Sequence, residues 1–251
     1  MAVFRKSRSG APAGFFRCEA AGLRWLAEAG GVPVVRVLEV DEAHLDLERL
    51  ESVSPSRTSA RAFGTGLATM HAAGADAFGS SPPGWSGDGF FGPLDHPLPL
   101  VSGSYESWGE FQAECRIEPL ARDLTAAGIE VAGMGELAAR LRAGAFDDDE
   151  PPARLHGDLW SGNVMWTAAG ATLIDPAAHG GHRETDLAML ALFGLPYLDD
   201  VLTAYDERAP LRRGWRHRIG LHQVYPVGVH ALLFGGSYIS QVKRLVAETT
   251  R

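Results

Sequence analysis

The sequence lacks the features that would connect it to nucleic acid or to an oxidising compartment. Acidic residues outnumber basic ones by 31 to 23, and the formal net charge of −8 argues against general nucleic-acid binding, which requires a basic face. The two cysteines, Cys18 and Cys115, lie far apart and form no C-x-x-C motif. We therefore expect a reducing, cytoplasmic location.

Long apolar runs are also missing. The longest one, 187–198, contains a glycine and a proline and is too short to cross a bilayer. No apolar run follows the basic residues near Met1, as a signal peptide would require. We therefore expect no membrane segment and no membrane partner.

The sequence does contain a short strand-rich part at its beginning. Hydrophobic residues make up 45% of the 251 residues, which is enough for a sizeable core in one large domain or two small ones. Residues 3–6, 33–40 and 44–50 are rich in strand-forming residues, whereas the apolar residues of 15–29 recur at helical spacing. This pattern predicts a helix laid on a small sheet.

Helical patterns dominate the rest of the chain. Helices are expected from near Thr58 and across 108–124, with a kink at Pro119. The last part of the chain is expected to be helical with breaks at Gly194–Pro196, Pro210, Pro226 and Gly235–Gly236. Segment 75–103 is rich in Gly, Pro and Ser and is too long for a simple connection, so we expect a structured, functional loop there.

The residues that carry chemistry lie between His156 and Asp175. Asp158 and Asn163 are five residues apart, and a predicted hairpin turn at 168–170 would return Asp175 to the side of Asn163. Phosphoryl transfer needs a carboxylate near the attacking hydroxyl and oxygen ligands that hold Mg²⁺ on the phosphates. Either aspartate alone is more simply explained as a turn or strand-end residue, but the combination predicts a kinase. Asp158 would orient or deprotonate the acceptor hydroxyl, and Asn163 and Asp175 would bind Mg²⁺.

The run from His156 to Asn163, HGDLWSGN, resembles the catalytic loop of the fructosamine kinase (ketosamine-3-kinase) family. That family belongs to the aminoglycoside-phosphotransferase and choline-kinase group, which has a protein-kinase-like fold. Segments 174–194, 90–93 and 108–117 are also similar to the family, so the resemblance covers nearly the whole chain. Its most specific part is the Trp-Ser-Gly insert at 160–162, since the wider group shares the His-Gly-Asp and the Asn.

The resemblance implies an α+β, two-lobed protein-kinase-like fold. Residues 1–51 would form a partial N-terminal lobe, and 52–251 a mainly helical lobe for catalysis and substrate binding. The family has two further strands and a Gly-rich turn before its lysine strand, whereas here Met1 begins almost at the lysine. A start codon placed too late or a real truncation would explain this. In the second case we expect a truncated small lobe that binds ATP weakly, because backbone donors for the phosphates are missing.

Several further roles follow from the resemblance by position. Lys6 would contact the phosphates of ATP, with Glu19 as its partner carboxylate. The linker containing Glu48 and Leu50 would bond the adenine edge through its backbone. Trp160 would either stack on a sugar ring or anchor its own loop, and both alternatives stay open.

Two more residues are expected to act on the loop itself. Asp186 would cap a helix or brace the backbone of the catalytic loop, and His156 would order that loop by hydrogen bonds. A zinc site of His156, His179 and His182 is rejected, because zinc sites usually use tighter spacing or cysteine ligands.

The acceptor implied by the resemblance is a ketosamine, a sugar joined to an amine that is free or part of a protein lysine. Family members phosphorylate the 3-hydroxyl of the sugar, and the product then breaks down and frees the amine. Two alternatives stay open. One is a kinase for another small alcohol, such as an aminoglycoside or an amino alcohol. The other is a kinase-like protein that binds a partner without turnover. The sequence does not indicate an oligomeric state.

Overall fold

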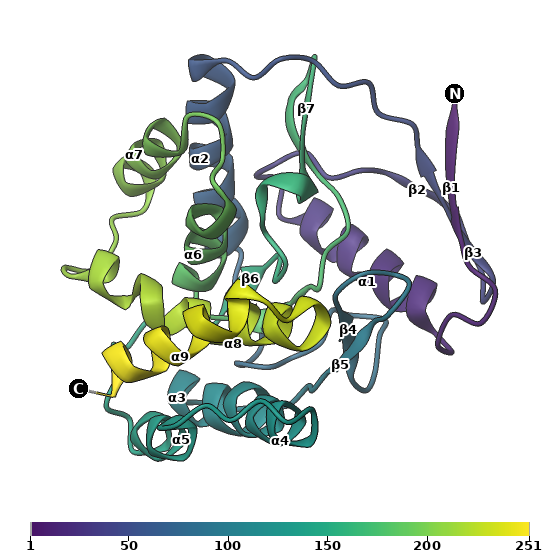
Figure 1. Ribbon diagram of the computed structural model, residues 1–251. Coiled ribbons are helices and arrows are strands. Elements are labelled where there is room, and N and C mark those ends of the chain that lie inside the picture. The colour runs from purple at the N-terminus through teal and green to yellow at the C-terminus, as the bar shows by residue number, and fades with distance from the viewer. Residues whose placement is uncertain (1, 251) are drawn as a thin grey trace.

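The computed structural model describes residues 2–250, and Figure 1 shows a small sheet at one side of a mainly helical body. The sheet consists of β1 (Val3–Ser7), β3 (His44–Glu48) and β2 (Val37–Val40), antiparallel in that order. Helix α1 (Phe15–Glu28) packs on the sheet through its apolar side. The predicted helix on a small sheet is therefore confirmed, although β2 is shorter than the predicted strand.

The larger part of the chain supplies most of the helices. They are α2 (Arg57–Ala72), α3 (Trp108–Gln112), α4 (Glu118–Ala126), α5 (Met134–Arg142), α6 (Glu184–Phe193), α7 (Leu198–Arg208), α8 (Trp215–Phe234) and α9 (Ser237–Thr249). Helices α2 and α7 lie side by side, α8 lies against α6 and α9, and α3 to α5 form a separate layer below them (Figure 1). The α+β fold class is confirmed.

Three pairs of short antiparallel strands lie in the connections between the helices. Strand β4 (Gly89–Phe91) pairs with β5 (Leu98–Leu100), and β6 (Ala153–Leu155) pairs with β9 (His179–Gly181). Between the last two, the predicted hairpin is present as β7 (Val164–Thr167) and β8 (Gly170–Leu173). The loop from β6 to β7 and the loop from β8 to β9 therefore lie next to each other.

One prediction about proline was wrong. Pro226 does not break the helix, because α8 continues through it from residue 215 to 234. An internal proline costs about 3 kcal/mol, and burial of α8 between α4, α6 and α9 offsets that cost. The kink expected at Pro119 stays a prediction, and the helical run is irregular directly before this residue, where Ala113–Ile117 form a π-helical turn.

The division of the chain at residue 51 stays a prediction. Leu26 and Val32, from the first part, are buried in one cluster with α2 and α7 of the second part. The remaining apolar side chains of α1 instead pack on the small sheet. No helix among residues 2–250 is both long and apolar enough to cross a membrane.

The contact between α2 and α7 depends on a glycine. A Cβ atom added to Gly64 would lie 2.1 Å from the backbone oxygen of Val201 and 3.1 Å from the nitrogen of Tyr205. Backbone atoms cannot move aside as a flexible side chain can. We therefore expect Gly64→Ala to lower the free energy of unfolding by about 1–3 kcal/mol, as overpacking generally does.

Gly135 in α5 provides the matched control. It is also helical, but an added Cβ would meet no atom within 4 Å. Gly135→Ala should be neutral or stabilising by about 0.5–1 kcal/mol, because alanine favours the helix. Urea unfolding of both variants measures the difference, and equal effects would contradict the close packing of α2 on α7.

Candidate active site

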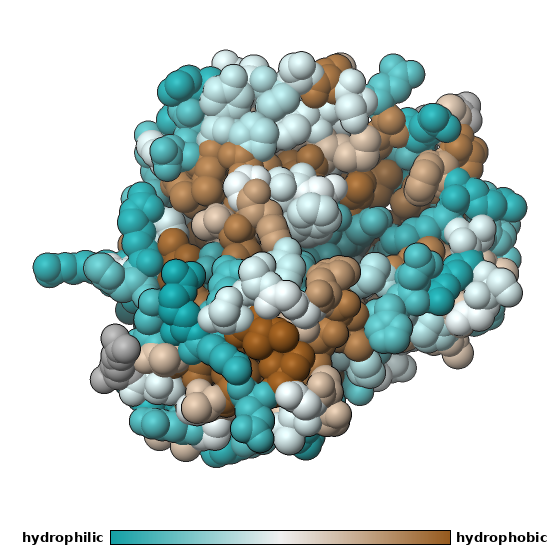
Figure 2. All heavy atoms as spheres, viewed as in Figure 1, coloured by the Kyte–Doolittle hydropathy of each residue, from teal (hydrophilic) through white to brown (hydrophobic). Residues whose placement is uncertain are grey.

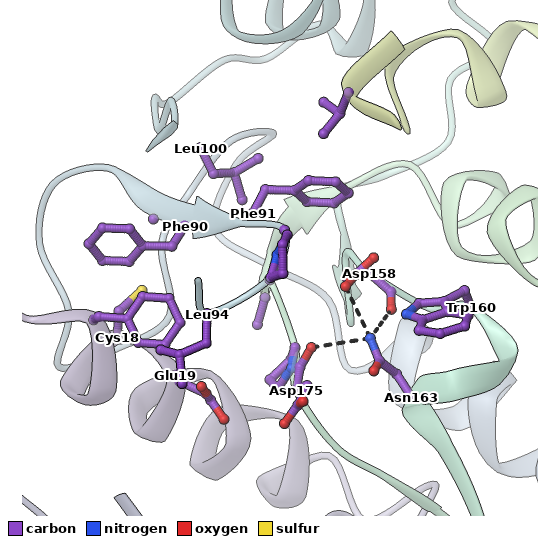
Figure 3. Close-up of a pocket in the computed structure, with 18 of the residues that line it drawn as sticks. Cys18, Glu19, Phe90, Phe91, Leu94, Leu100, Asp158, Trp160, Asn163 and Asp175 are labelled. Atoms are coloured by element: carbon purple, nitrogen blue, oxygen red, sulfur yellow. Dashed lines mark hydrogen bonds between the residues drawn. The ribbon is translucent and has the colours of Figure 1, made fainter. Parts of the chain in front are cut away.

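A cavity of about 280 Å³ lies where β1, α1, the β4–β5 hairpin, the two loops around β7 and β8, and α8 meet. Figure 3 shows the side chains that line it. Six residues predicted from the sequence line this cavity: Lys6, Glu19, Asp158, Trp160, Asn163 and Asp175. They come from parts of the chain up to 169 residues apart in sequence, so only the fold brings them together.

The loop after β6 places Asp158. Gly157 before it has φ +81°, and a Cβ there would lie 2.1 Å from the backbone oxygen of Ala177, so only glycine fits. Asn163 then fixes the loop from the far end. Its Nδ2 donates to the backbone oxygen of Asp158 at 2.8 Å and to Asp158 Oδ2 at 3.0 Å (Figure 3).

The same amide nitrogen also reaches the next loop. Asn163 Nδ2 lies 3.4 Å from the backbone oxygen of Asp175. Because the nitrogen bonds the protein, the amide oxygen Oδ1 is left for another partner. Asp175 itself has φ +52°, an uncommon left-handed conformation, and its side chain is 45% exposed. An amide oxygen and a carboxylate are ligands that suit Mg²⁺.

The predicted ion pair between β1 and α1 is present. Lys6 Nζ lies 2.7 Å from Glu19 Oε2 and 3.2 Å from Asp175 Oδ1. Burial lowers the pKa of Lys6, but Glu19 and Asp175 outweigh it and the pKa is raised, so the ammonium stays charged. Burial raises the pKa of Glu19 to about 7, against the opposing effect of Lys6.

Asp158 also has an altered protonation equilibrium. Burial raises its pKa to about 7, and the hydrogen bond from Asn163 opposes the shift. A carboxylate with a pKa near neutrality accepts a proton more readily than an ordinary aspartate does. The geometry therefore suits Asp158 to take a proton from a hydroxyl group.

A buried carboxylate supports the loop from behind. Asp186, the third residue of α6, accepts the backbone N–H of His156 at 2.8 Å and that of Gly157 at 2.9 Å. Its Oδ2 also lies 3.1 Å from Nε2 of His71, a residue of α2. His156 bonds the backbone oxygen of Ile174 at 2.9 Å and thus joins the two loops. The bracing predicted for Asp186 and His156 is confirmed.

The linker residues lie elsewhere. Glu48 and Leu50 do not line this cavity. The backbone N–H of Glu48 already donates to the oxygen of Arg36 at 3.0 Å. The adenine contact assigned to this linker stays a prediction.

Trp160 lies at the opposite wall of the cavity and is 39% exposed. Its ring covers Gly162, where an added Cβ would lie 2.2 Å from the indole. The ring also makes an edge contact with Phe193, with centroids 5.8 Å apart. These contacts fit both roles considered for Trp160, an anchor of its own loop and a wall for the acceptor.

Sequence reasoning missed the contribution of α8. Val229, His230, Leu233 and Phe234 line the cavity next to the catalytic loop. Their spacing of three and four residues could have identified one helix face, but nothing in the sequence indicates which loop that face meets. The tip of the β4–β5 hairpin also lines the cavity, where Arg8 donates to the backbone oxygen of Leu94. Segment 75–103 is structured, as predicted.

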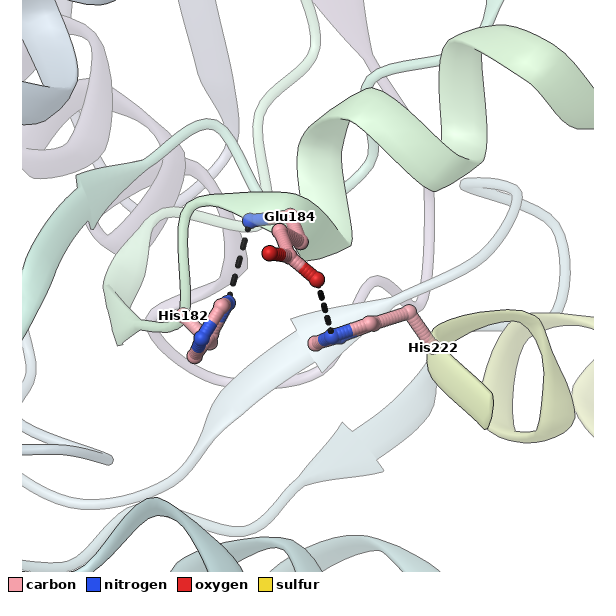
Figure 4. Close-up of side chains that lie close together, drawn as sticks. All are labelled: His182, Glu184 and His222. Atoms are coloured by element: carbon pink, nitrogen blue, oxygen red, sulfur yellow. Dashed lines mark hydrogen bonds and ion pairs between the residues drawn. The ribbon is translucent and has the colours of Figure 1, made fainter. Parts of the chain in front are cut away.

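A second cluster has the residue types of a metal site. His182, Glu184 and His222 are buried, and one ligand atom of each lies within 4.8 Å of the others (Figure 4). However, the carboxylate of Glu184 already accepts two hydrogen bonds from Arg218. His182 bonds Asp148 through Nε2 and accepts the Glu184 amide at Nδ1.

The surrounding charges are also balanced without a metal. Three carboxylates there pair with three guanidinium groups: Asp148, Glu150 and Glu184 with Arg183, Arg212 and Arg218. A divalent cation would have to displace a bound arginine. We therefore assign this cluster a structural role: it links the segment before β6 to α6 and α8.

The comparisons with known proteins agree with this geometry. The chain is 34% identical to a probable ketoamine kinase of Thermus thermophilus, covering 96% of this chain and 85% of the relative. A probable ketoamine kinase of Enterococcus faecium is 33% identical, with coverage of 98% and 86%. A crystal structure assigned as a fructosamine-3-kinase of Thermobifida fusca superposes with a TM-score of 0.89 at 46% identity, covering 98% of this chain and 85% of that one.

A more distant likeness concerns the fold alone. The aminoglycoside phosphotransferase APH(4)-Ia, solved with ADP and hygromycin B, has a TM-score of 0.56 at 18% identity, covering 98% and 85% of the two chains. Fold and site together define a phosphotransferase of the protein-kinase-like class that acts on an alcohol group. More narrowly, the chain matches the fructosamine kinase family over residues 1–251 and belongs to it.

The bracing by Asp186 leads to a prediction. Asp186→Asn keeps the shape, but its amide can no longer accept from both loop N–H groups and His71. At least one hydrogen bond to a charged group is lost, so the free energy of unfolding should fall by about 1.5–3 kcal/mol. Asp199→Asn is the control, since this exposed residue of α7 should change stability by about 0.5 kcal/mol at most. Equal urea midpoints for the two variants would contradict the bracing.

Proposed function

We propose that the protein transfers the γ-phosphate of ATP to a sugar hydroxyl of a ketosamine, with the 3-hydroxyl of the sugar as acceptor. The observation that carries the proposal is that Asp158 lies in one cavity with the Lys6–Glu19 pair and with the two oxygen-bearing residues Asn163 and Asp175. Membership of the fructosamine kinase family supports the class of acceptor.

The chemical roles follow from the geometry. The acceptor hydroxyl donates its proton to Asp158 while its oxygen attacks the γ-phosphorus, and the bond from that phosphorus to the β-γ bridging oxygen breaks to release ADP. The raised pKa of Asp158 lets it hold the proton and pass it to solvent afterwards. Lys6, fixed by Glu19, neutralises charge on the phosphates.

The residues present fit Mg²⁺. Within residues 2–250 no group donates a hydrogen bond to Oδ1 of Asn163, whereas its Nδ2 bonds the protein, and the Asp175 carboxylate is exposed to the cavity. These two residues would hold the ion, which supplies charge neutralisation on the phosphates when bound. Glu48 and Leu50 would bond the adenine edge from the linker.

The acceptor would be a small ketosamine or a glycated lysine of a protein in the cytoplasm. Trp160 would form a wall of its site. A comparison of two kinds of acceptor distinguishes a ketosamine kinase from a kinase for other small alcohols. Fructose- and ribulose-derived ketosamines should be phosphorylated with a higher kcat/KM than an aminoglycoside or an amino alcohol, as measured by coupled release of ADP.

Asp158→Asn tests the proposed base. The amide is close in shape but cannot accept the hydroxyl proton, so kcat should fall about 10²–10⁴-fold. The control is Asp199→Asn, which lies outside the cavity. Circular dichroism checks the fold of both variants. Turnover within a factor of two of the native enzyme would remove Asp158 from the mechanism.

Asp175→Ala tests the proposed metal ligand. Removing the carboxylate should abolish the increase in ATP affinity that Mg²⁺ or Mn²⁺ produces in the native protein, and zinc should be a poor substitute. Calorimetric titration of ATP with and without each ion measures this. If native protein binds ATP equally well with EDTA and with Mg²⁺, the ligand assignment is wrong.

A further inference from the structure

Five aromatic rings form a continuous group beside the cavity, which we call the aromatic shelf. Its members are Trp160, Phe193, His230, Phe234 and Tyr238. The ring of His230 is central, with centroids 5.0 Å from Phe193, 5.6 Å from Phe234 and 5.1 Å from Tyr238. Trp160 joins the group through Phe193.

The shelf opens onto the same cavity as the catalytic loop. Trp160, His230 and Phe234 line that cavity together with Asp158. Phe234 is 61% exposed, the largest exposed fraction among the large apolar side chains of residues 2–250. Exposed apolar surface that adjoins a reactive carboxylate marks a place for a ligand.

The electrostatics of the shelf favour a cation. None of the cavity residues from α8 is charged, and the last turn of this 20-residue helix contains no basic side chain. The helix ends at Phe234 and α9 begins at Ser237, so the opposite partial charges of the two helix ends adjoin at the shelf. The negative potential that favours a cation therefore comes from the faces of the aromatic rings.

His230 contributes a hydrogen-bond acceptor. Its Nδ1 lies 2.7 Å from the backbone oxygen of Pro226, and a carbonyl can only accept, so the proton is on Nδ1. In the neutral ring Nε2 then carries a lone pair, and no residue in the described part of the chain donates to it. Burial lowers the pKa of His230, which favours the neutral ring.

We propose that the aromatic shelf binds the protonated amine of the acceptor, with His230 Nε2 accepting an N–H of that ammonium group and Phe234 and Trp160 lying against it. This inference rests on the proposed function. It adds to that function the place at which the amine of the ketosamine binds. Val229 and Leu233 beside the shelf suit an apolar substituent on that nitrogen.

A matched pair of acceptors tests the amine. One is 1-deoxy-1-(alkylamino)fructose, and the other is the 1-O-alkyl ether of fructose, in which oxygen replaces the ammonium nitrogen. A desolvated cation–π contact together with a charged hydrogen bond corresponds to a preference for the amine of about 10–100-fold in kcat/KM. Equal kcat/KM for amine and ether would overturn the proposal.

Three variants test whether the shelf residues cause the preference for the amine over the ether. Phe234→Leu keeps apolar bulk but removes the ring face, and His230→Phe keeps a ring but removes the lone pair. Each should reduce the preference for the amine over the ether about 5–10-fold, because KM for the amine rises more than KM for the ether. Leu38→Ala, an exposed apolar residue of β2 outside the cavity, should retain the full preference. Retention of the full preference in both shelf variants would also overturn the proposal.

A binding measurement separates this inference from the proposed function. The 3-deoxy analogues of the amine and the ether lack the hydroxyl that would be phosphorylated, and calorimetry reports their affinity without turnover. Tighter binding of the amine analogue by at least tenfold supports the shelf even if no ketosamine is phosphorylated. Phosphorylation of amine and ether at equal rates, with equal affinity of their analogues, supports the kinase and refutes the shelf.

Discussion

The site depends on one buried carboxylate. Asp186 has no access to solvent, yet it accepts bonds from two consecutive amides of the catalytic loop and lies against His71. Burial by itself would raise its pKa, but these partners lower the pKa below the ordinary value and keep the group charged. A charge buried in this way tolerates little movement of its partners. The loop that carries Asp158 is therefore fixed to α2 and α6.

The cavity itself is built to attract positive charge. Three carboxylates, Glu19, Asp158 and Asp175, face a single ammonium group from Lys6. Two of the three have pKa values of about 7, because burial makes their charged forms unfavourable. A bound cation lowers these pKa values, because it stabilises the charged carboxylates.

Two pairs in this site could be predicted from the sequence, because each pair is local. The turn between β7 and β8 brings Asp175 to Asn163, and the Lys6–Glu19 pair, predicted from the family resemblance, joins a strand to the next helix. The face of α8 could not be predicted, because only tertiary packing brings His230 to the loop of Asp158, which lies 72 residues earlier in the sequence. The prediction that Pro226 breaks the helix was wrong because it considered the local cost of a proline and not the burial of the surrounding helix.

The π-helical turn at Ala113–Ile117 has a consequence for how the layer of α3 to α5 meets the core. In an uninterrupted α-helix each residue turns the chain by about 100°, so Leu120, nine residues after Phe111, would point to the opposite side. Both are nevertheless buried in the same cluster. A π turn accommodates one extra residue and rotates the following segment back. The turn therefore aligns the apolar side chains of the helical segments before and after it. Both segments can then present one apolar surface to α8.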